Sequence, residues 1–307
     1  MTISIGLGLM DFPFTTTQGF WRWVDLCESG GVDSLWQTDR IVSRTPILES
    51  MTTMAALAGR TRRIKFGMNV VSLAFRDPVL LAKQCATIDV LSEGRLLPAF
   101  GIGNPLSPEW TALGLDTTTR GRRTDEALEI ITRLWREESV TFAGRFSTLE
   151  RASILPKPVQ KHLPMWIGGS SEAAIRRTAR YGTGWIAGSE PPAEAGRIAR
   201  AIAAAAIAAG RPIDADHYGA GFPFHFGDPT DAALKPAQDA FRKRTGRDPA
   251  GYFAIGDADT ILAQVQAYVA AGISKFILRP VVTGDEAMLD QTRRLIETVL
   301  PWAPRSP

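Results

Sequence analysis

The fold of this chain is decided by residues 64–103, which read IKFGMNVVSLAFRDPVLLAKQCATIDVLSEGRLLPAFGIG. The stretch begins with a short apolar run, which is typical of a strand covered on both faces. Asp77-Pro78 predicts the start of a helix, because Pro is tolerated in the first turn, and Gly94 predicts its end. Leu96–Phe100 is the next expected strand. The stretch therefore predicts a β–α–β unit with parallel strands and a right-handed crossover.

The same alternation of strand and helix patterns runs through the rest of the chain. It predicts six more strands, at Ile3–Leu9, Ser34–Gln37, Met165–Ile167, Trp185–Ala187, Ala220–Phe226 and Lys275–Leu278. Eight strands that alternate with helices favour an α/β fold, a (β/α)8 TIM barrel that forms a single domain over residues 1–307. A doubly wound open sheet is the alternative. Pro105–Thr119 after the fourth strand and Gly227–Gly251 after the seventh are expected to be inserted loops, which we interpret as lids.

The composition is that of an ordinary soluble protein, with 45% hydrophobic residues, 22% charged residues and a formal net charge of +3. No basic stretch is interleaved with aromatic residues, which argues against a nucleic-acid partner. The longest apolar run, Ala199–Ala209, is too short to cross a bilayer, and no basic segment precedes the first strand. Cys27 and Cys85 lie in helical patterns and are expected to be buried free thiols. We therefore expect a cytoplasmic protein without a membrane or nucleic-acid partner.

Several short motifs follow one another in a fixed order along the chain. They include Arg76-Asp77-Pro78, Ala86-Thr87-Ile88-Asp89, Ser92-Glu93-Gly94-Arg95-Leu96, Gly101-Ile102-Gly103 and Gly168-Gly169-Ser170. In their order and spacing these motifs resemble the luciferase-like flavin monooxygenases and their relatives that use the deazaflavin F420. The resemblance covers most of residues 1–190 and the last barrel unit. It rests on the number and order of the motifs, since each motif alone is short.

The resemblance implies a TIM barrel that holds a flavin-type ring at the C-terminal ends of its strands, and a non-proline cis peptide within Val70–Leu73. It also implies an oxidoreductase, which we interpret as a monooxygenase that uses reduced FMN and oxygen on a small organic substrate. F420-dependent hydride transfer is the alternative, and a flavin-binding protein without catalysis is a third interpretation. A flavin reductase and a second copy of the chain, as a homodimer, are the macromolecular partners that we consider.

Three segments supply the main candidates for the site. Gly168–Ser171 lies between a strand and a helix, where backbone N–H groups bind phosphate, although a serine there could simply cap the helix. Asp39 is expected to face the cofactor or to act as an acid or base, unless it only caps a turn. His225 suits a general base, although a lone His is more often structural. The expected catalytic residues are Asp39 and His225, and the expected cofactor-binding residues are Asp39, Asn69, Val71, Ser72, Gly103, Asn104, Gly168, Gly169, Ser170 and Ser171.

Two positions depart from the deazaflavin sugar-phosphate dehydrogenases of this family. A His follows the Asp after strand two of those enzymes, and a Glu follows their strand-four glycines, whereas this chain has Arg40 and Asn104. The resemblance therefore does not imply that activity. No metal site is expected, because the three His residues are scattered. Gly101-Ile102-Gly103 lacks the third glycine of a dinucleotide fingerprint, and no GxSxG motif occurs.

Several arginines have two interpretations each. Arg40 either holds an anionic substrate or cofactor phosphate, or pairs with Glu49. Arg279, just after the last strand, either faces the site or pairs with Asp285. One of the arginines that lead into the helix after the first insertion is expected to reach a phosphate, and the candidates are Arg120, Arg122 and Arg123.

Overall fold

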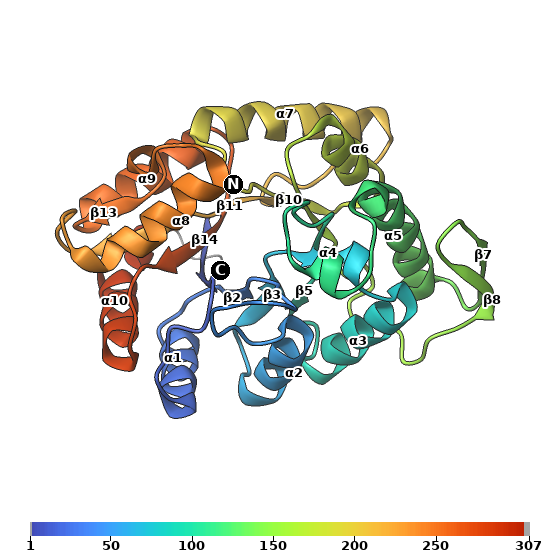
Figure 1. Cartoon of the computed structure of the whole chain (residues 1–307), viewed down its shortest axis with the longest axis horizontal. Coiled ribbons are helices and arrows are strands. Elements are labelled where there is room, and N and C mark those ends of the chain that lie inside the picture. Colours follow the sequence, from blue (N-terminus) through green and yellow to red (C-terminus); the bar gives the residue numbers. More distant parts are fainter. Residues whose placement is uncertain (1, 304–307) are drawn as a thin grey trace.

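The computed structural model describes residues 2–303, in which strands alternate with helices along the chain (Figure 1). Three of the eight barrel strands are interrupted, namely the third, the fourth and the seventh. The third consists of β3 (Lys65–Met68) and β4 (Val71–Ser72), and the fourth of β5 (Leu96–Leu97) and β6 (Ala99–Gly101). The others are β1 (Ser4–Leu9), β2 (Ser34–Gln37), β9 (Trp166–Gly168), β10 (Gly184–Ile186), β11 (Tyr218–Ala220) with its continuation β12 (Pro223–Phe226), and β14 (Lys275–Pro280).

These strands form a closed ring of parallel pairs. Each strand pairs with the next one in sequence, and the last strand, β14, pairs with β1, with Ile5 opposite Phe276. The interrupted third and fourth strands pair twice, β3 with β5 and β4 with β6. The predicted (β/α)8 barrel is therefore confirmed. The seventh strand was expected as one segment, Ala220–Phe226, but it divides into β11 and β12, and both pair with β14.

A helix follows each barrel strand and covers its outer face. The eight helices are α1 (Thr17–Ser29), α2 (Ser50–Arg60), α3 (Pro78–Leu91), α5 (Arg120–Arg136), α6 (Glu172–Tyr181), α7 (Pro192–Ala208), α9 (Ala258–Ala270) and α10 (Asp285–Thr298). Side chains such as Asp77 and Ser171 cap these helices by accepting hydrogen bonds from backbone N–H groups of the first turn. Helix α2 begins at Ser50, because the Glu49 side chain accepts from the Thr52 backbone N–H as its cap. Each helix N-terminus therefore lies at the end of the barrel where the strands end, which we call the mouth.

Both predicted insertions are present at the mouth. The insertion after the fourth strand contains the short helix α4 (Glu109–Ala112), and the insertion after the seventh contains α8 (Lys235–Thr245). The second insertion ends in a strand that the sequence did not predict, β13 (Ala254–Gly256), which pairs with β12. An antiparallel hairpin, β7 (Val140–Ala143) and β8 (Thr148–Ala152), precedes β9. Figure 1 shows α4 and α5 on one side of the molecule and α8 on the other.

The interior of the barrel is filled by a cluster of apolar side chains that is separate from the core between strands and helices. The members of this inner cluster are Trp36, Leu97, Ala99, Trp166, Ile186 and Ile277, with Val70 packed on them. The rings of Trp36 and Trp166 meet edge to face, with their centroids 6.3 Å apart. Because side chains fill the interior, a ligand has room only above them, at the mouth.

A buried ion pair lies at the opposite end of the barrel. Lys275 is the first residue of β14, and its ammonium group donates to the carboxylate of Asp33, just before β2. Lys65 of β3 lies 3.9 Å from the same carboxylate and is more exposed. This pair therefore ties the start of the last strand to the start of the second.

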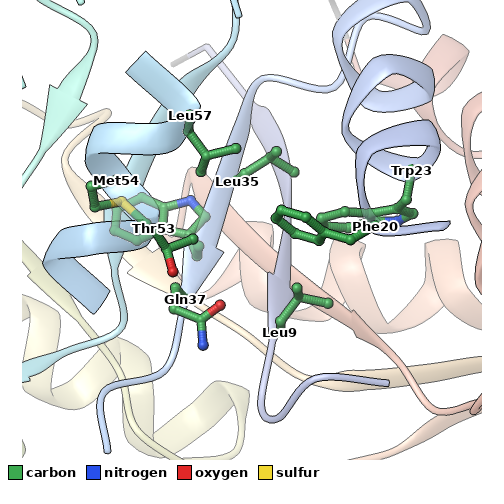
Figure 2. A pocket seen from close by; sticks show the side chains of 9 residues that line it. Leu9, Phe20, Trp23, Leu35, Gln37, Thr53, Met54 and Leu57 are labelled. Carbon is green, nitrogen blue, oxygen red and sulfur yellow. The ribbon is translucent and has the colours of Figure 1, made fainter. Parts of the chain in front are cut away.

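Figure 2 shows a small cavity of about 10 Å³ between the sheet and helices α1 and α2. Its walls are Leu9, Phe20, Trp23, Leu35, Trp36, Gln37, Thr53, Met54 and Leu57. This volume is close to that of one water molecule, so the cavity is a packing gap and not a cofactor site. Cys27 and Cys85 are buried free thiols, as predicted. Within residues 2–303, the helices are too short or too polar to pass through a bilayer.

Candidate cofactor site at the barrel mouth

Val70 forms an apolar floor at the mouth of the barrel. The peptide bond Asn69-Val70 is cis, one bond before the segment Val70–Leu73 in which the cis bond is expected. The half-buried Val70 side chain lies on the inner cluster, between the backbones of Gly101 and Gly168. A Cβ atom at Gly101 would lie 2.8 Å from Val70 Cγ2, and one at Gly168 would lie 3.2 Å away. The two glycines therefore let the backbone of neighbouring strands approach Val70 closely, and its outer surface remains open to a ligand.

The neighbours of Val70 are placed differently. Val71 is fully buried in the outer core and pairs with Phe100 of β6, so its side chain does not reach the mouth. By position, Val70 and not Val71 is therefore the candidate for the cofactor contact that we predicted for Val71. Asn69 and Ser72 are half-buried, and within residues 2–303 their side chains form no hydrogen bond. Both polar groups are therefore free to bind the polar edge of a ring that lies on Val70.

Asp39 lies where the sequence predicts, at the end of β2, but its carboxylate is occupied by other protein groups. Arg76 donates to both oxygens, at 2.6 and 2.8 Å, and Ser50 Oγ and the Ser72 backbone N–H donate as well, at 2.8 and 3.1 Å. The Asp39 side chain is 1% exposed and that of Arg76 is 11% exposed. Glu49 is a second partner of Arg76, at 3.1 Å. In this conformation Asp39 therefore positions the backbone after Val70 and is not available as a base.

His225 lies on β12 beneath the second insertion and is 5% exposed. Its Nδ1 lies 3.1 Å from the carbonyl oxygen of Val281, and its Nε2 lies 3.3 Å from a carboxylate oxygen of Asp231. Its neighbours Phe224 and Phe226 pack in the outer core, so their side chains do not line the mouth. His225 fastens the insertion to two strands here, and acting as a general base would require the insertion to open.

Gly103 and Asn104 shape the start of the first insertion. Gly103 has a φ of +78°, and a Cβ there would lie 3.3 Å from Ser72 Oγ and from the ring of Trp110. The side-chain oxygen of Asn104 accepts from the Leu106 backbone N–H at 2.9 Å. The backbone carbonyl of Asn104 accepts from the Trp110 indole N–H at 2.7 Å. The Asn104 side-chain oxygen therefore serves the loop, whereas Gly103 lies directly beside the candidate ligand group of Ser72.

Glu109 fastens the first insertion to the loop after β2. Its carboxylate is 2% exposed and accepts hydrogen bonds from the backbone N–H groups of Ile41 and Val42, at 3.1 and 3.4 Å, and from the hydroxyl of Ser107. Burial acts to raise the pKa of Glu109, but these hydrogen bonds outweigh burial and lower it below its ordinary value. The ionised carboxylate therefore holds the two loops together.

We expect Glu109→Gln to loosen this insertion, because hydrogen bonds to a buried charge contribute about 1.5–3 kcal/mol. Because the pKa is lowered on folding, the stabilisation is fully present above pH 4.5 and is lost as the pH falls through the folded value. Amide hydrogen exchange of residues 105–116 should be faster in the variant at pH 7, and acid should bring the wild-type protein towards the variant. Glu286→Gln, at an exposed glutamate, is the control. Unchanged exchange in Glu109→Gln would contradict this role.

The segment Gly168–Ser171 connects the Val70 floor to the N-terminus of α6. Gly168 touches Val70, and Ser171 caps the helix, its hydroxyl accepting from the Ala174 backbone N–H at 3.2 Å. Gly169 has a φ of +111°, which favours glycine. The capping interpretation therefore holds for Ser171, while Ser170 and the free N–H groups of the first turn stay open to an anion.

Arg120 is the first residue of α5, a helix that contacts α6. Arg177 of α6 donates to the carbonyl of Gly121 at 3.3 Å and pairs with Asp125 at 2.5 Å, which brings the start of α5 against α6. Arg120 Nη1 donates to the Thr117 carbonyl at 2.9 Å, but its buried Nε has no hydrogen-bond partner among residues 2–303. A buried donor without a partner is costly, so an anion near this position would satisfy it.

The comparisons with known proteins agree with this geometry. Residues 15–254 match the model of the family described as luciferase-like monooxygenase. The chain belongs to this family. The membership confirms the resemblance that the motifs suggest and agrees with the barrel and its two insertions at the mouth.

The proteins that this chain is similar to have different activities in their names. An F420-dependent glucose-6-phosphate dehydrogenase of Microbacterium testaceum is 31% identical over 201 residues, which are 62% of this chain and 58% of that protein. The chain spans about half the length of the curated relatives it matches. An F420-dependent secondary alcohol dehydrogenase in complex with an F420-acetone adduct has a TM-score of 0.85 at 18% identity and is covered completely, as is this chain. The oxygenating constituent of 3,6-diketocamphane monooxygenase from Pseudomonas putida, in complex with FMN, has a TM-score of 0.77 at 18% identity, again with full coverage of both chains.

Sequence reasoning missed some residues of this luciferase-like site. Val70 was passed over for Val71, because the cis bond that turns Val70 inward is not visible in a hydrophobic pattern. The role of Arg76 was missed because its partner Asp39 lies 37 residues away. Glu109 was missed as well, although an acidic residue inside an otherwise apolar loop segment is a signal that could have drawn attention to it.

Proposed function

We propose that this luciferase-like protein is an oxidoreductase that binds reduced FMN at the barrel mouth and oxygenates a small organic substrate. The observation that carries the proposal is the apolar Val70 floor beside an anion-binding helix end. Gly168 touches Val70, and Ser171 begins α6 three residues later, so a ring on the floor and a phosphate at the helix lie within one short cofactor. The buried, unpartnered Nε of Arg120, at the start of the neighbouring helix α5, is a further donor that an anion would satisfy.

The chain's own residues would then bind the cofactor, orient it and keep water away. Val70 would support one face of the ring, and Asn69 and Ser72 would bind its polar edge. When bound, reduced flavin supplies the electrons for the reaction with oxygen. Exposed apolar side chains in the segments at the mouth would exclude water from the site. These side chains are Met10, Ile41, Leu106 and Leu113. These side chains suit an apolar part of a substrate.

F420-dependent hydride transfer is the second candidate. It is supported by the relative named an F420-dependent glucose-6-phosphate dehydrogenase and by the structural likeness to an F420-dependent alcohol dehydrogenase. Hydride transfer to or from an alcohol needs a group that moves the alcohol proton. Asp39 is fully engaged and His225 is buried, so the residues that we predicted for this task are occupied in this conformation. This favours oxygenation, which depends more on a dry site.

An anaerobic titration of the purified protein with FMN, reduced FMN and F420 tests the proposal directly. We expect reduced FMN to bind most tightly, and oxygen added to that complex should oxidise the flavin more slowly than free reduced FMN. Preference for F420 would move the function to hydride transfer. Binding of none of the three would overturn both candidates. The flavin reductase and the second copy of the chain stay predictions.

Substitution of Gly101 by alanine should weaken cofactor binding about tenfold, which corresponds to about 1.4 kcal/mol. The new Cβ would lie 2.8 Å from Val70 Cγ2 and would push the floor into the cofactor space. The matched control is Gly59→Ala on α2, where a Cβ meets no atom within 4 Å. The titration of both variants, with circular dichroism to confirm folding, provides the comparison. Equal affinities of the Gly101 variant and the wild-type protein would rule out Val70 as the floor.

A further inference from the structure

Three arginines reach the mouth from different elements. Arg40 follows β2, Arg244 lies in the last turn of α8, and Arg279 lies near the end of β14. None of the three forms an ion pair with any carboxylate in residues 2–303. The partners that the sequence suggested are engaged elsewhere, because Glu49 pairs with Arg76 and Asp285 binds Thr16.

Arg279 has N–H groups that are not used in hydrogen bonds. It lies two residues after Ile277 on β14, on the same face of the strand, and Ile277 belongs to the inner cluster. The Arg279 side chain therefore also points into the barrel. Nη2 donates to the Gly221 carbonyl at 3.0 Å and to the Tyr252 hydroxyl at 2.7 Å. The buried Nε has no partner within residues 2–303. An arginine offers five N–H donors in a rigid fork, so most of this fork is available to a planar oxyanion.

An aromatic stack connects Arg279 to Arg244. The guanidinium carbon of Arg244 lies 5.8 Å from the centre of the Phe241 ring. Phe241 stacks on Tyr252, with ring centroids 4.7 Å apart and an interplanar angle of 16°, and the Tyr252 hydroxyl accepts from Arg279. The stack therefore holds the two guanidinium groups on one side of the second insertion, where α8 lies.

The positive charges of Arg279 and Arg40 act on Arg244. Burial lowers the pKa of Arg244, Tyr252 raises it in part, and repulsion from Arg279 and Arg40 lowers it further. In the sheet, β1 alone separates β2, which leads into Arg40, from β14, which carries Arg279. The nearest acidic influence on Arg40 is Asp11, whose pKa is raised by burial and lowered in part by Arg40. Asp11 is therefore a carboxylate near Arg40, whereas within residues 2–303 no carboxylate forms an ion pair with Arg244 or Arg279.

This cluster lies across the mouth from the phosphate position proposed above. Strand β9 leads into α6. Around the ring, two barrel strands lie between β9 and β2, and two lie between β9 and β14. Figure 1 shows α8 and β14 on one side of the molecule and α5 on the other. An anion bound by these arginines is therefore a second negative group, distinct from a cofactor phosphate at α6.

We propose that Arg40, Arg244 and Arg279 bind the oxyanion of the substrate, and that the substrate is an organic carboxylate or phosphate ester with an apolar body. That the bound anion is the substrate depends on the proposed function, whereas the presence of an oxyanion site does not. The exposed apolar side chains around the mouth, among them Met10 and Ile41, match such a body. An anionic tail of the cofactor has the same chemistry and is the other source that the experiment must separate.

Isothermal titration of the full chain with benzoate and phenyl phosphate, at constant ionic strength, tests the site, with benzyl alcohol as the neutral counterpart. We expect at least one anion to bind the wild-type protein about tenfold more tightly than benzyl alcohol. Arg244→Gln and Arg279→Gln should each weaken that anion about tenfold, which is typical for a charged hydrogen bond. Arg242→Gln is the matched control, since Arg242 lies on the same helix in an exposed pair with Asp239.

Two outcomes would overturn the proposal. One is equal binding of the anions and benzyl alcohol to the wild-type protein, and the other is unchanged anion binding in Arg244→Gln, a variant on an exposed helix that should fold normally. Titration of reduced FMN and F420 into the same variants separates the sources. A tenfold loss confined to F420, without binding of either anion, would assign the arginines to the cofactor and contradict the proposal. Anion binding that depends on these arginines, in a protein that binds no cofactor, would support the site and refute the proposed function.

Discussion

Replacement of Asp39 by alanine is expected to lower the free energy of unfolding by about 3–5 kcal/mol, because it removes one partner of a buried ion pair. The remaining guanidinium of Arg76 is 11% exposed and would keep only Glu49, at 3.1 Å. The substitution also frees the backbone N–H of Ser72, which follows the Val70 floor. We therefore expect cofactor affinity to fall in the same variant.

Urea unfolding followed by circular dichroism measures the loss of stability. Asp25→Ala is the control, since Asp25 and Arg60 form a pair at 2.5 Å in which both side chains are about half exposed. Exposed pairs contribute less than about 1 kcal/mol. The double variant Asp39→Leu/Arg76→Met should regain much of the stability, because no buried charge is left unpaired. A loss below about 1 kcal/mol in Asp39→Ala would show that the network is not what holds this loop.

Lys275→Met should have an effect of similar size at the other end of the barrel, about 3 kcal/mol, because it leaves the carboxylate of Asp33 without its main partner. Lys65, at 3.9 Å, is too far to replace it fully. Methionine has nearly the length of lysine, so the loss would reflect the charge and not a cavity. The mouth is far from this pair, and we expect cofactor affinity to stay within about twofold of the wild-type value, or roughly 0.4 kcal/mol.

Thermal and urea unfolding of Lys275→Met and of Asp33→Leu/Lys275→Met provide the measurement. We expect the double variant to be more stable than the single one, because removal of both charges also removes the unpaired carboxylate. Arg22→Ala, at an exposed pair with Glu286, is the surface control. Equal stability of the single and double variants would mean that Asp33 is satisfied by water or by Lys65, and the ion pair would then have no special role.

Some residues of the candidate site could be predicted from the sequence. The sequence placed Asp39, Gly103 and Gly168–Ser171 after predicted strands, and residues that follow barrel strands lie at the mouth. It did not show that Asp39 would be occupied by Arg76, since hydrogen-bond partners across a barrel depend on how neighbouring loops pack. Whether a carboxylate is free to react was therefore decided by the fold.

The sequence by itself determined the order of strands and helices, the caps such as Asp77, and the two insertions, because these depend on periodicity and on contacts within a few residues. It also determined the family, through the order of its motifs. The tertiary structure alone decided that Val70 and not Val71 faces the mouth, and that Tyr252 and Phe241 connect Arg279 to Arg244. Closure of the ring brings together residues more than 200 positions apart, and no local pattern carries information over that distance.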